Sequence, residues 1–116
     1  MIVKGKVLKG EQKATKLGFP TANIEINVDL EPGIYAGKAV VDGITHNASI
    51  YIPSKNPRLL EAHILDFDCD LYEKEIEVHI LNRLRKEVRA TDDQKLREMI
   101  LNDVEMTRLS IGNLSK

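Results

Sequence analysis

The chain lacks the features of an exported or membrane-bound protein. Cys69 is the only cysteine, so no intrachain disulfide can form, and a reducing compartment is expected. No apolar run approaches the length that spans a bilayer, and the first ten residues, "MIVKGKVLKG", lack the apolar core of a signal peptide. We therefore expect a cytoplasmic protein with no membrane partner.

An excess of one charge sign is also missing. The formal net charge is -1, which argues against nucleic-acid binding driven by overall charge. The few aromatic residues are too dispersed for a base-stacking platform, so no nucleic-acid partner is expected. The lysines are unevenly distributed, and a cluster near the N-terminus could form a local phosphate site or could simply be solvated surface: Lys4, Lys6, Lys9, Lys13 and Lys16.

With 116 residues, the chain is long enough for one domain with a core, and most of it has the alternation of strands. Asp42-Gly43 lies between two such runs and is the strongest hairpin signal, because glycine tolerates the positive φ of a type I′ turn. About six strands in short sequential hairpins predict a mainly β fold, an antiparallel sheet closed into a small barrel. The predicted strands cover residues 2–7, 22–28, 33–41, 44–52, 61–67 and 74–81.

The end of the chain changes to a helical period. Thr91 and Gln94 fit a capping box at the start of a helix, and Gly112 offers a stop. Apolar residues repeat between them at helical spacing and predict a helix packed outside the barrel: Leu96, Met99, Ile100 and Val104.

The segment "LGFPTANI", residues 17–24, carries a possible binding site. Pro20 stiffens the chain as it enters a strand, and alternation places Thr21 and Asn23 on one face. A hydroxyl and an amide oxygen two residues apart could both reach Mg²⁺, which is often held by few protein oxygens together with substrate phosphates. The alternative is that both are solvent-facing strand residues after a turn.

Other constellations are weaker. The segment "DFDCDLYEKEIE" nearly fits a calcium loop, but Leu71 stands where glycine belongs and the flanks have strand character. An acidic hairpin end is the better interpretation. His46, His63 and His79 are scattered and lack the close partners of a zinc site.

Together these segments resemble riboflavin kinase, most closely the kinase module of bacterial bifunctional FAD synthetases. The resemblance rests on "LGFPTANI", "LEPGIYAGKAVVDG", "EAHILDFDCDLYEKEIEV" and "LRKEVRATDDQKLREMILND", in that order across almost the whole chain. It implies a single domain over residues 1–116, a six-stranded antiparallel barrel with a C-terminal helix. It also implies a phosphotransferase that moves the γ-phosphate of a nucleoside triphosphate, with ATP expected, to the ribityl 5′-hydroxyl of riboflavin and produces FMN.

The resemblance assigns roles residue by residue. Glu61 would be the catalytic residue that activates the hydroxyl, and Arg85 would bind the substrate from a loop that closes over it. Thr21 and Asn23 would hold Mg²⁺. The nucleotide would be bound by residues of the N-terminal loop and of the segment after it: Gly10, Lys13, Gly18, Thr21 and Asn23.

The chain also departs from the family pattern. Lys13 replaces an arginine, and other positions replace family glycines, an arginine, a threonine and a phenylalanine: Gln12, Ala14, Ile50, Ile52, Ser54, Glu73 and Ala90. These changes leave two interpretations, an active kinase or a non-catalytic flavin- or nucleotide-binding module on the same barrel. We expect a monomer that acts on small molecules, and no FAD synthesis, because the adenylyltransferase half of the bifunctional proteins is absent from this sequence.

Overall fold

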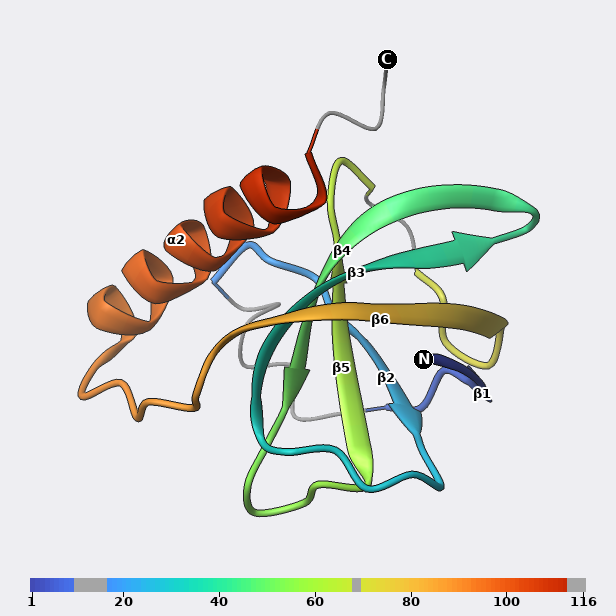
Figure 1. Cartoon of the computed structure of the whole chain (residues 1–116), viewed down its shortest axis with the longest axis horizontal. Helices are drawn as coiled ribbons and strands as arrows, with labels where there is room; N and C mark the ends of the chain where they lie inside the picture. The colour runs from blue at the N-terminus through green and yellow to red at the C-terminus, as the bar shows by residue number, and fades with distance from the viewer. Residues whose placement is uncertain (10–16, 68–69, 113–116) are drawn as a thin grey trace.

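Six strands and one long helix make up the part of the chain that the computed structural model describes, residues 1–9, 17–67 and 70–112 (Figure 1). The elements are β1 Ile2–Lys6, β2 Ala22–Glu25, β3 Gly33–Val41, β4 Ile44–Ile52, β5 Leu59–Ile64, β6 Glu75–Arg85 and α2 Asp93–Ile111. Within those residues no helix is both long and apolar enough to cross a membrane.

The strands form one antiparallel sheet in the order β1-β6-β3-β4-β5-β2. The two edge strands of the sheet, β1 and β2, approach each other: an antiparallel bridge joins Leu8, just after β1, to Asn23 in β2. The Leu8 N–H donates to the Asn23 carbonyl oxygen at 2.6 Å. The sheet is thus a nearly closed barrel, and the predicted fold class is confirmed.

The Asp42-Gly43 turn joins β3 to β4 as predicted. Both residues have positive φ, 51° and 79°, as a type I′ turn requires. These two strands begin and end where alternation placed them. Other bounds differ: β6 continues to Arg85 because it pairs with β3 as far as Ile34, and β5 ends at Ile64, shortly before the chain turns at Asp66 with φ 57°.

The core is the inside of the barrel, filled by alternate residues of its strands. Ile50 and Ile52, where the resemblance to riboflavin kinases expects a glycine and an arginine, are fully buried there. Gly37 leaves the room that Ile50 fills, since a Cβ at Gly37 would collide with the Ile50 side chain and with the His79 carbonyl. These two departures from the family pattern are therefore part of the barrel's packing.

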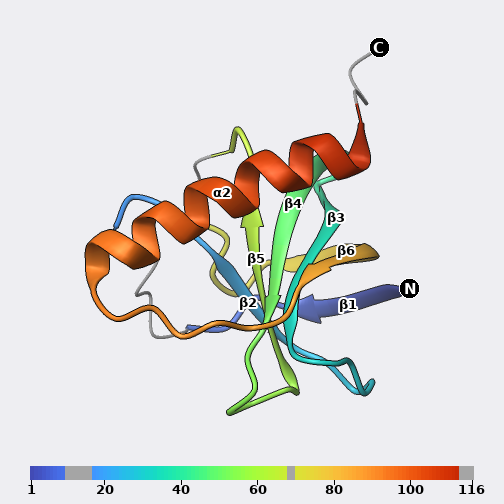
Figure 2. The same ribbon diagram turned by 60° about the vertical axis from the view of Figure 1, so that its left-hand side comes forward.

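Helix α2 lies across the outside of the barrel, over β3 and β4 (Figure 2). Its N-cap is Asp92, whose Oδ1 accepts from the Lys95 N–H at 2.8 Å, so the predicted capping box at Thr91 is wrong by one residue. Asp92 rather than Thr91 precedes the first helical residue, and its side chain reaches the third N–H. Gly112 ends the helix as predicted, with φ 77° and its N–H bonded to the Arg108 carbonyl.

Candidate functional site

Asn23 and Glu61, which the sequence could not place relative to each other, are cross-strand neighbours. Asn23 in β2 pairs directly with Glu61 in β5. Side chains of directly opposed residues in an antiparallel pair point to the same face, with Cβ atoms about 4.5–5.5 Å apart. Asn23 is only 4% exposed, so the alternative that it is a solvent-facing strand residue is wrong. Thr21, just before β2, is half-buried.

A third polar side chain extends this pair. Tyr51 in β4 is the partner of Glu61 on the other side of β5. Ile50 and Ile52, on either side of Tyr51, point into the core, so Tyr51 belongs to the outer face of the barrel. Asn23, Glu61 and Tyr51 therefore form one row across three adjacent strands, which we call the outer row. Tyr51 was not among the predicted site residues. Its position between two isoleucines could have indicated that its side chain faces outward, because side chains alternate along a strand.

Glu87, in the irregular segment between β6 and α2, is bound at the end of the outer row. The Tyr51 hydroxyl donates to Glu87 Oε2, and the Ser54 N–H donates to Glu87 Oε1 at 3.1 Å. The pKa of Tyr51 is raised well above its usual value. Burial is the largest cause, and the nearby Glu87 carboxylate and the charge of Glu61 add to it. Partial burial opposes ionisation of Glu87, but the bonds from Ser54 and Tyr51 outweigh it and lower the pKa of Glu87. At neutral pH the tyrosine is thus the donor and the glutamate the charged acceptor.

Arg85 is held beside this cluster by the helix. Its Nε and Nη2 atoms donate to the two carboxylate oxygens of Asp103, each at 2.8 Å, and Asp103 is only 5% exposed. Its Nη1 atom donates to the Lys86 carbonyl oxygen at 3.0 Å. A bidentate pair of this kind fixes the guanidinium in one orientation. Arg85 therefore joins the end of β6 to α2, and its role in substrate binding stays a prediction.

Phe19 fixes the segment that leads into Thr21. Its ring meets the His63 ring edge-on at 5.6 Å between centroids, and the Arg97 guanidinium lies 5.7 Å from the Phe19 centroid. His63 belongs to β5 and Arg97 to α2, so Phe19 lies between barrel and helix. Gly18, with φ 95°, makes the bend before it.

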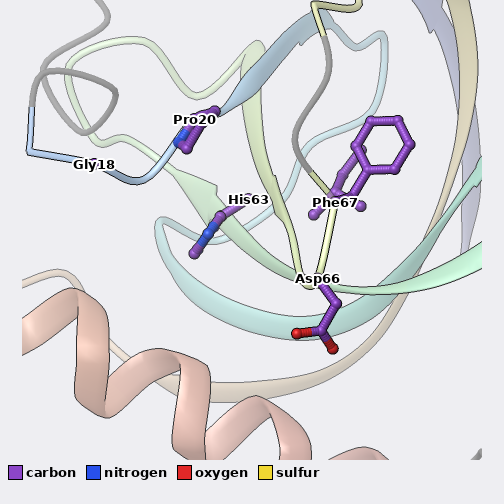
Figure 3. A pocket seen from close by; sticks show the side chains of 6 residues that line it. Gly18, Pro20, His63, Asp66 and Phe67 are labelled. Carbon is purple, nitrogen blue, oxygen red and sulfur yellow. The ribbon is translucent and has the colours of Figure 1, made fainter.

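A cavity of about 540 Å³ opens next to this segment (Figure 3). This volume is within the range of small-molecule sites. Its lining comes from the Gly-Phe-Pro segment and from the end of β5 with the turn that follows: Gly18, Pro20, His63, Ile64, Asp66 and Phe67. Gly18, a predicted nucleotide-binding residue, is therefore at a cavity that a small molecule could enter.

Two titratable groups in this lining have shifted pKa values. Burial, aided by the positive charge of Arg108, lowers the pKa of His63. The His63 Nδ1 atom is buried and has no hydrogen-bond partner among the described residues. The Arg108 guanidinium donates to both oxygens of Asp66, at 3.0 and 3.1 Å, and lowers the pKa of that carboxyl. At neutral pH the cavity thus has a neutral imidazole and a paired carboxylate on its wall.

Some predicted residues lie outside the described residues, namely Gly10 and Lys13 of the N-terminal loop. The calcium-like segment is described only in part. Asp66 is paired with Arg108, and Asp70 accepts from the Tyr72 N–H at 2.9 Å. Within the described ranges, no three His, Cys, Asp or Glu side chains are grouped as ligands of a metal ion.

The structure is thus a nearly closed antiparallel barrel with a polar outer row and an adjacent cavity. The chain belongs to the riboflavin kinase family, since the family model described as flavokinase, riboflavin kinase, matches residues 1–111. The chain is similar to the bifunctional riboflavin kinase/FMN adenylyltransferases of Buchnera aphidicola (38% identical, 91% of this chain and 37% of the relative) and Listeria monocytogenes (37% identical, 96% and 38%). It thus spans less than two fifths of the length of these two relatives.

The fold is similar to that of a solved riboflavin kinase. The crystal structure of the riboflavin kinase from Trypanosoma brucei matches with a TM-score of 0.72 at 23% identity, over 95% of this chain and 76% of that one. At this identity the likeness shows the fold alone. It agrees with the antiparallel barrel and C-terminal helix described above.

Proposed function

We propose that this chain transfers the γ-phosphate of a nucleoside triphosphate, with ATP as the expected donor, to the 5′-hydroxyl of riboflavin and so produces FMN. The observation that carries the proposal is the direct pairing of Asn23 with Glu61. It brings the residue proposed to activate the hydroxyl next to a residue proposed to hold the metal and the phosphates. Family membership over residues 1–111 supports the same reaction.

Glu61 is the proposed catalytic residue. It lies on the outer face between Asn23 and Tyr51, while its neighbours Leu60 and Ala62 are fully buried in the core. A carboxylate held on a rigid strand can orient the riboflavin hydroxyl and accept its proton as the phosphoryl group moves. Because phosphoryl transfer depends chiefly on positioning and charge stabilisation, one such group is chemically sufficient.

Thr21 and Asn23 are the proposed Mg²⁺ ligands, and their chemistry fits a hard cation. A hydroxyl and an amide oxygen are ligands that Mg²⁺ accepts, and substrate phosphates complete its coordination. The Asn23 amide is almost buried beside a carboxylate, an unusual place for an amide without a polar role. When bound, the ion neutralises phosphate charge. The two residues would hold it at the start of β2, where Phe19 fixes the incoming chain.

The cavity beside Gly18 is the proposed place for part of the nucleotide, because it lies next to the segment that leads into Thr21 and Asn23. Gly10 and Lys13, which are outside the described residues, stay proposed members of the nucleotide site on the sequence resemblance alone. Ile50 and Ile52 are buried inside the barrel and leave the outer row unchanged, so they no longer count in favour of a non-catalytic binding module.

Formation of FMN from riboflavin, Mg²⁺ and ATP, CTP or GTP in separate reactions tests the proposal. We expect FMN with at least one donor. Glu61→Gln should lower kcat by roughly 10²- to 10⁴-fold, the usual contribution of general acid–base catalysis, and largely spare riboflavin binding. Glu25→Gln, on the exposed end of β2, is the matched control and should leave kcat unchanged.

Two outcomes would contradict the proposal. One is full activity in Glu61→Gln, which would remove the proposed base. The other is no FMN with any donor from folded wild-type protein that still binds riboflavin, which would identify a binding module.

A further inference from the structure

We propose that Tyr51 is a positioning residue: through Glu87 it holds the segment 86–92 against the end of β4 and so completes the riboflavin side of the site. The inference rests on the proposed function, because it assigns the wall beside Glu61 to the acceptor. We call the segment 86–92 the strap. It has no helix or strand of its own and joins β6 to α2.

The attachment of the strap uses both oxygens of one carboxylate. Glu87 accepts from the Tyr51 hydroxyl and from the Ser54 N–H, one donor on β4 and one just beyond it. Hydrogen bonds to an ionised acceptor are about twice as strong as neutral ones. The Arg85–Asp103 pair fixes the chain just before the strap. Glu87 provides a second attachment, within the strap itself.

The position of the attachment relates it to the reaction. Tyr51 is the register partner of Glu61, so its ring stands next to the proposed base. The Tyr51 hydroxyl donates to Glu87. The ring of Tyr51 is therefore the part of the side chain that a flat acceptor molecule can contact. Val88, next to Glu87 in the strap, is 52% exposed and offers a second apolar surface. A planar, largely apolar ring system such as that of riboflavin could pack against an aromatic ring and an exposed aliphatic side chain of this kind.

The first experiment is independent of the reaction. Amide hydrogen exchange of residues 86–92 is measured on the ligand-free protein, for the wild type, Tyr51→Phe and Tyr35→Phe. Loss of a charge-assisted hydrogen bond should speed exchange in the strap of Tyr51→Phe by roughly tenfold or more. Tyr35→Phe is the matched control, since it also removes a hydroxyl bond, to the Glu31 carbonyl at 2.6 Å, and neither of these two residues belongs to the strap. Unchanged exchange in the strap of Tyr51→Phe would overturn the proposal.

The second experiment relates the strap to riboflavin. Tyr51→Phe should raise the KM for riboflavin by roughly tenfold, with kcat within about twofold and the KM for the nucleotide unchanged. Glu87→Gln should act in the same direction, and the double variant should be no worse than the more affected single variant, because both remove one contact.

Each outcome decides one of the two proposals. A fall in kcat with an unchanged KM for riboflavin in Tyr51→Phe, or additive losses in the double variant, would overturn the role of the strap. Absence of FMN from the wild type would overturn the proposed function instead. In that case the exchange experiment still decides whether Tyr51 holds the strap, and riboflavin fluorescence titration of Tyr51→Phe decides whether the strap contacts a flavin.

Discussion

Glu73 adopts a backbone conformation that favours glycine. Its φ is 70°, in the turn where the Lys74 N–H bonds to the Leu71 carbonyl, and the resemblance to riboflavin kinases expects glycine at this position. A side chain in the left-handed region costs about 1–2 kcal/mol, so the turn accommodates a strained residue. The neighbouring bond from the Glu73 N–H to the Val7 carbonyl, at 2.9 Å, helps to hold the residue in that conformation.

Glu73→Gly should therefore stabilise the protein. Relief of the strain, less the greater chain entropy of glycine in the unfolded state, should raise the free energy of unfolding by roughly 0.5–1 kcal/mol. Urea denaturation measures the change. Glu75→Gly, two residues later at the start of β6, should instead lower it, because glycine weakens an ordinary strand position. Equal effects of the two substitutions would contradict the interpretation of strain at Glu73.

At the scale of elements, helix α2 is defined by its two caps and by the face that packs on the barrel. The buried face carries two polar residues, Asp103 and Thr107. Asp103 is satisfied by Arg85, whereas the Thr107 hydroxyl has no partner among the described residues. The helix is thus attached by a specific ion pair as well as by apolar packing, and its start determines where the strap ends.

The N-cap of α2 provides a test at this scale. Asp92→Ala removes the acceptor of the Lys95 N–H and should lower the free energy of unfolding by about 1 kcal/mol. Thr91→Ala, one residue earlier, is the matched control and should have a much smaller effect, since the cap is Asp92. Thermal or urea unfolding measures both variants. A larger loss in Thr91→Ala would restore the capping box that the sequence pattern predicted.

For the whole molecule, the contacts around the cavity make stability depend on pH. His63 lines it from β5, and Asp66 joins the following turn to the last turn of α2 through Arg108. Both groups have a pKa below the ordinary value in the folded state, His63 through burial and Asp66 through Arg108. The unfolded chain then binds more protons as the pH falls, so acid favours unfolding.

The free energy of unfolding should therefore be greatest above the ordinary histidine pKa of 6.5 and should decrease as the pH falls toward the lowered pKa of folded His63. A further decrease should follow below the ordinary Asp66 value of 3.8. Urea denaturation between pH 8 and 3 measures the curve. His63→Gln should flatten its upper part and leave the acid part in place, and an unchanged slope between pH 6.5 and 5 in this variant would contradict the assignment.

Local signals in the sequence determined most of the elements. Alternation placed β3 and β4 correctly, Asp42-Gly43 predicted their turn, and Gly112 predicted the end of α2. Each depends on side chains and backbone angles of a few consecutive residues, which the sequence displays directly. The sequence also predicted Glu61, Thr21 and Asn23 as site residues, but it did not predict how close to one another they lie.

Only the tertiary structure decided which residues share the site. The pairing of β2 with β5 and of β5 with β4 sets Asn23, Glu61 and Tyr51 in one row. β2 and β5 are far apart in the chain, and no local pattern encodes the register between them. Glu87 joins the outer row because the strap returns over β4 on its way to α2. The outer row therefore appears only when β4, β5 and β2 lie side by side in the sheet.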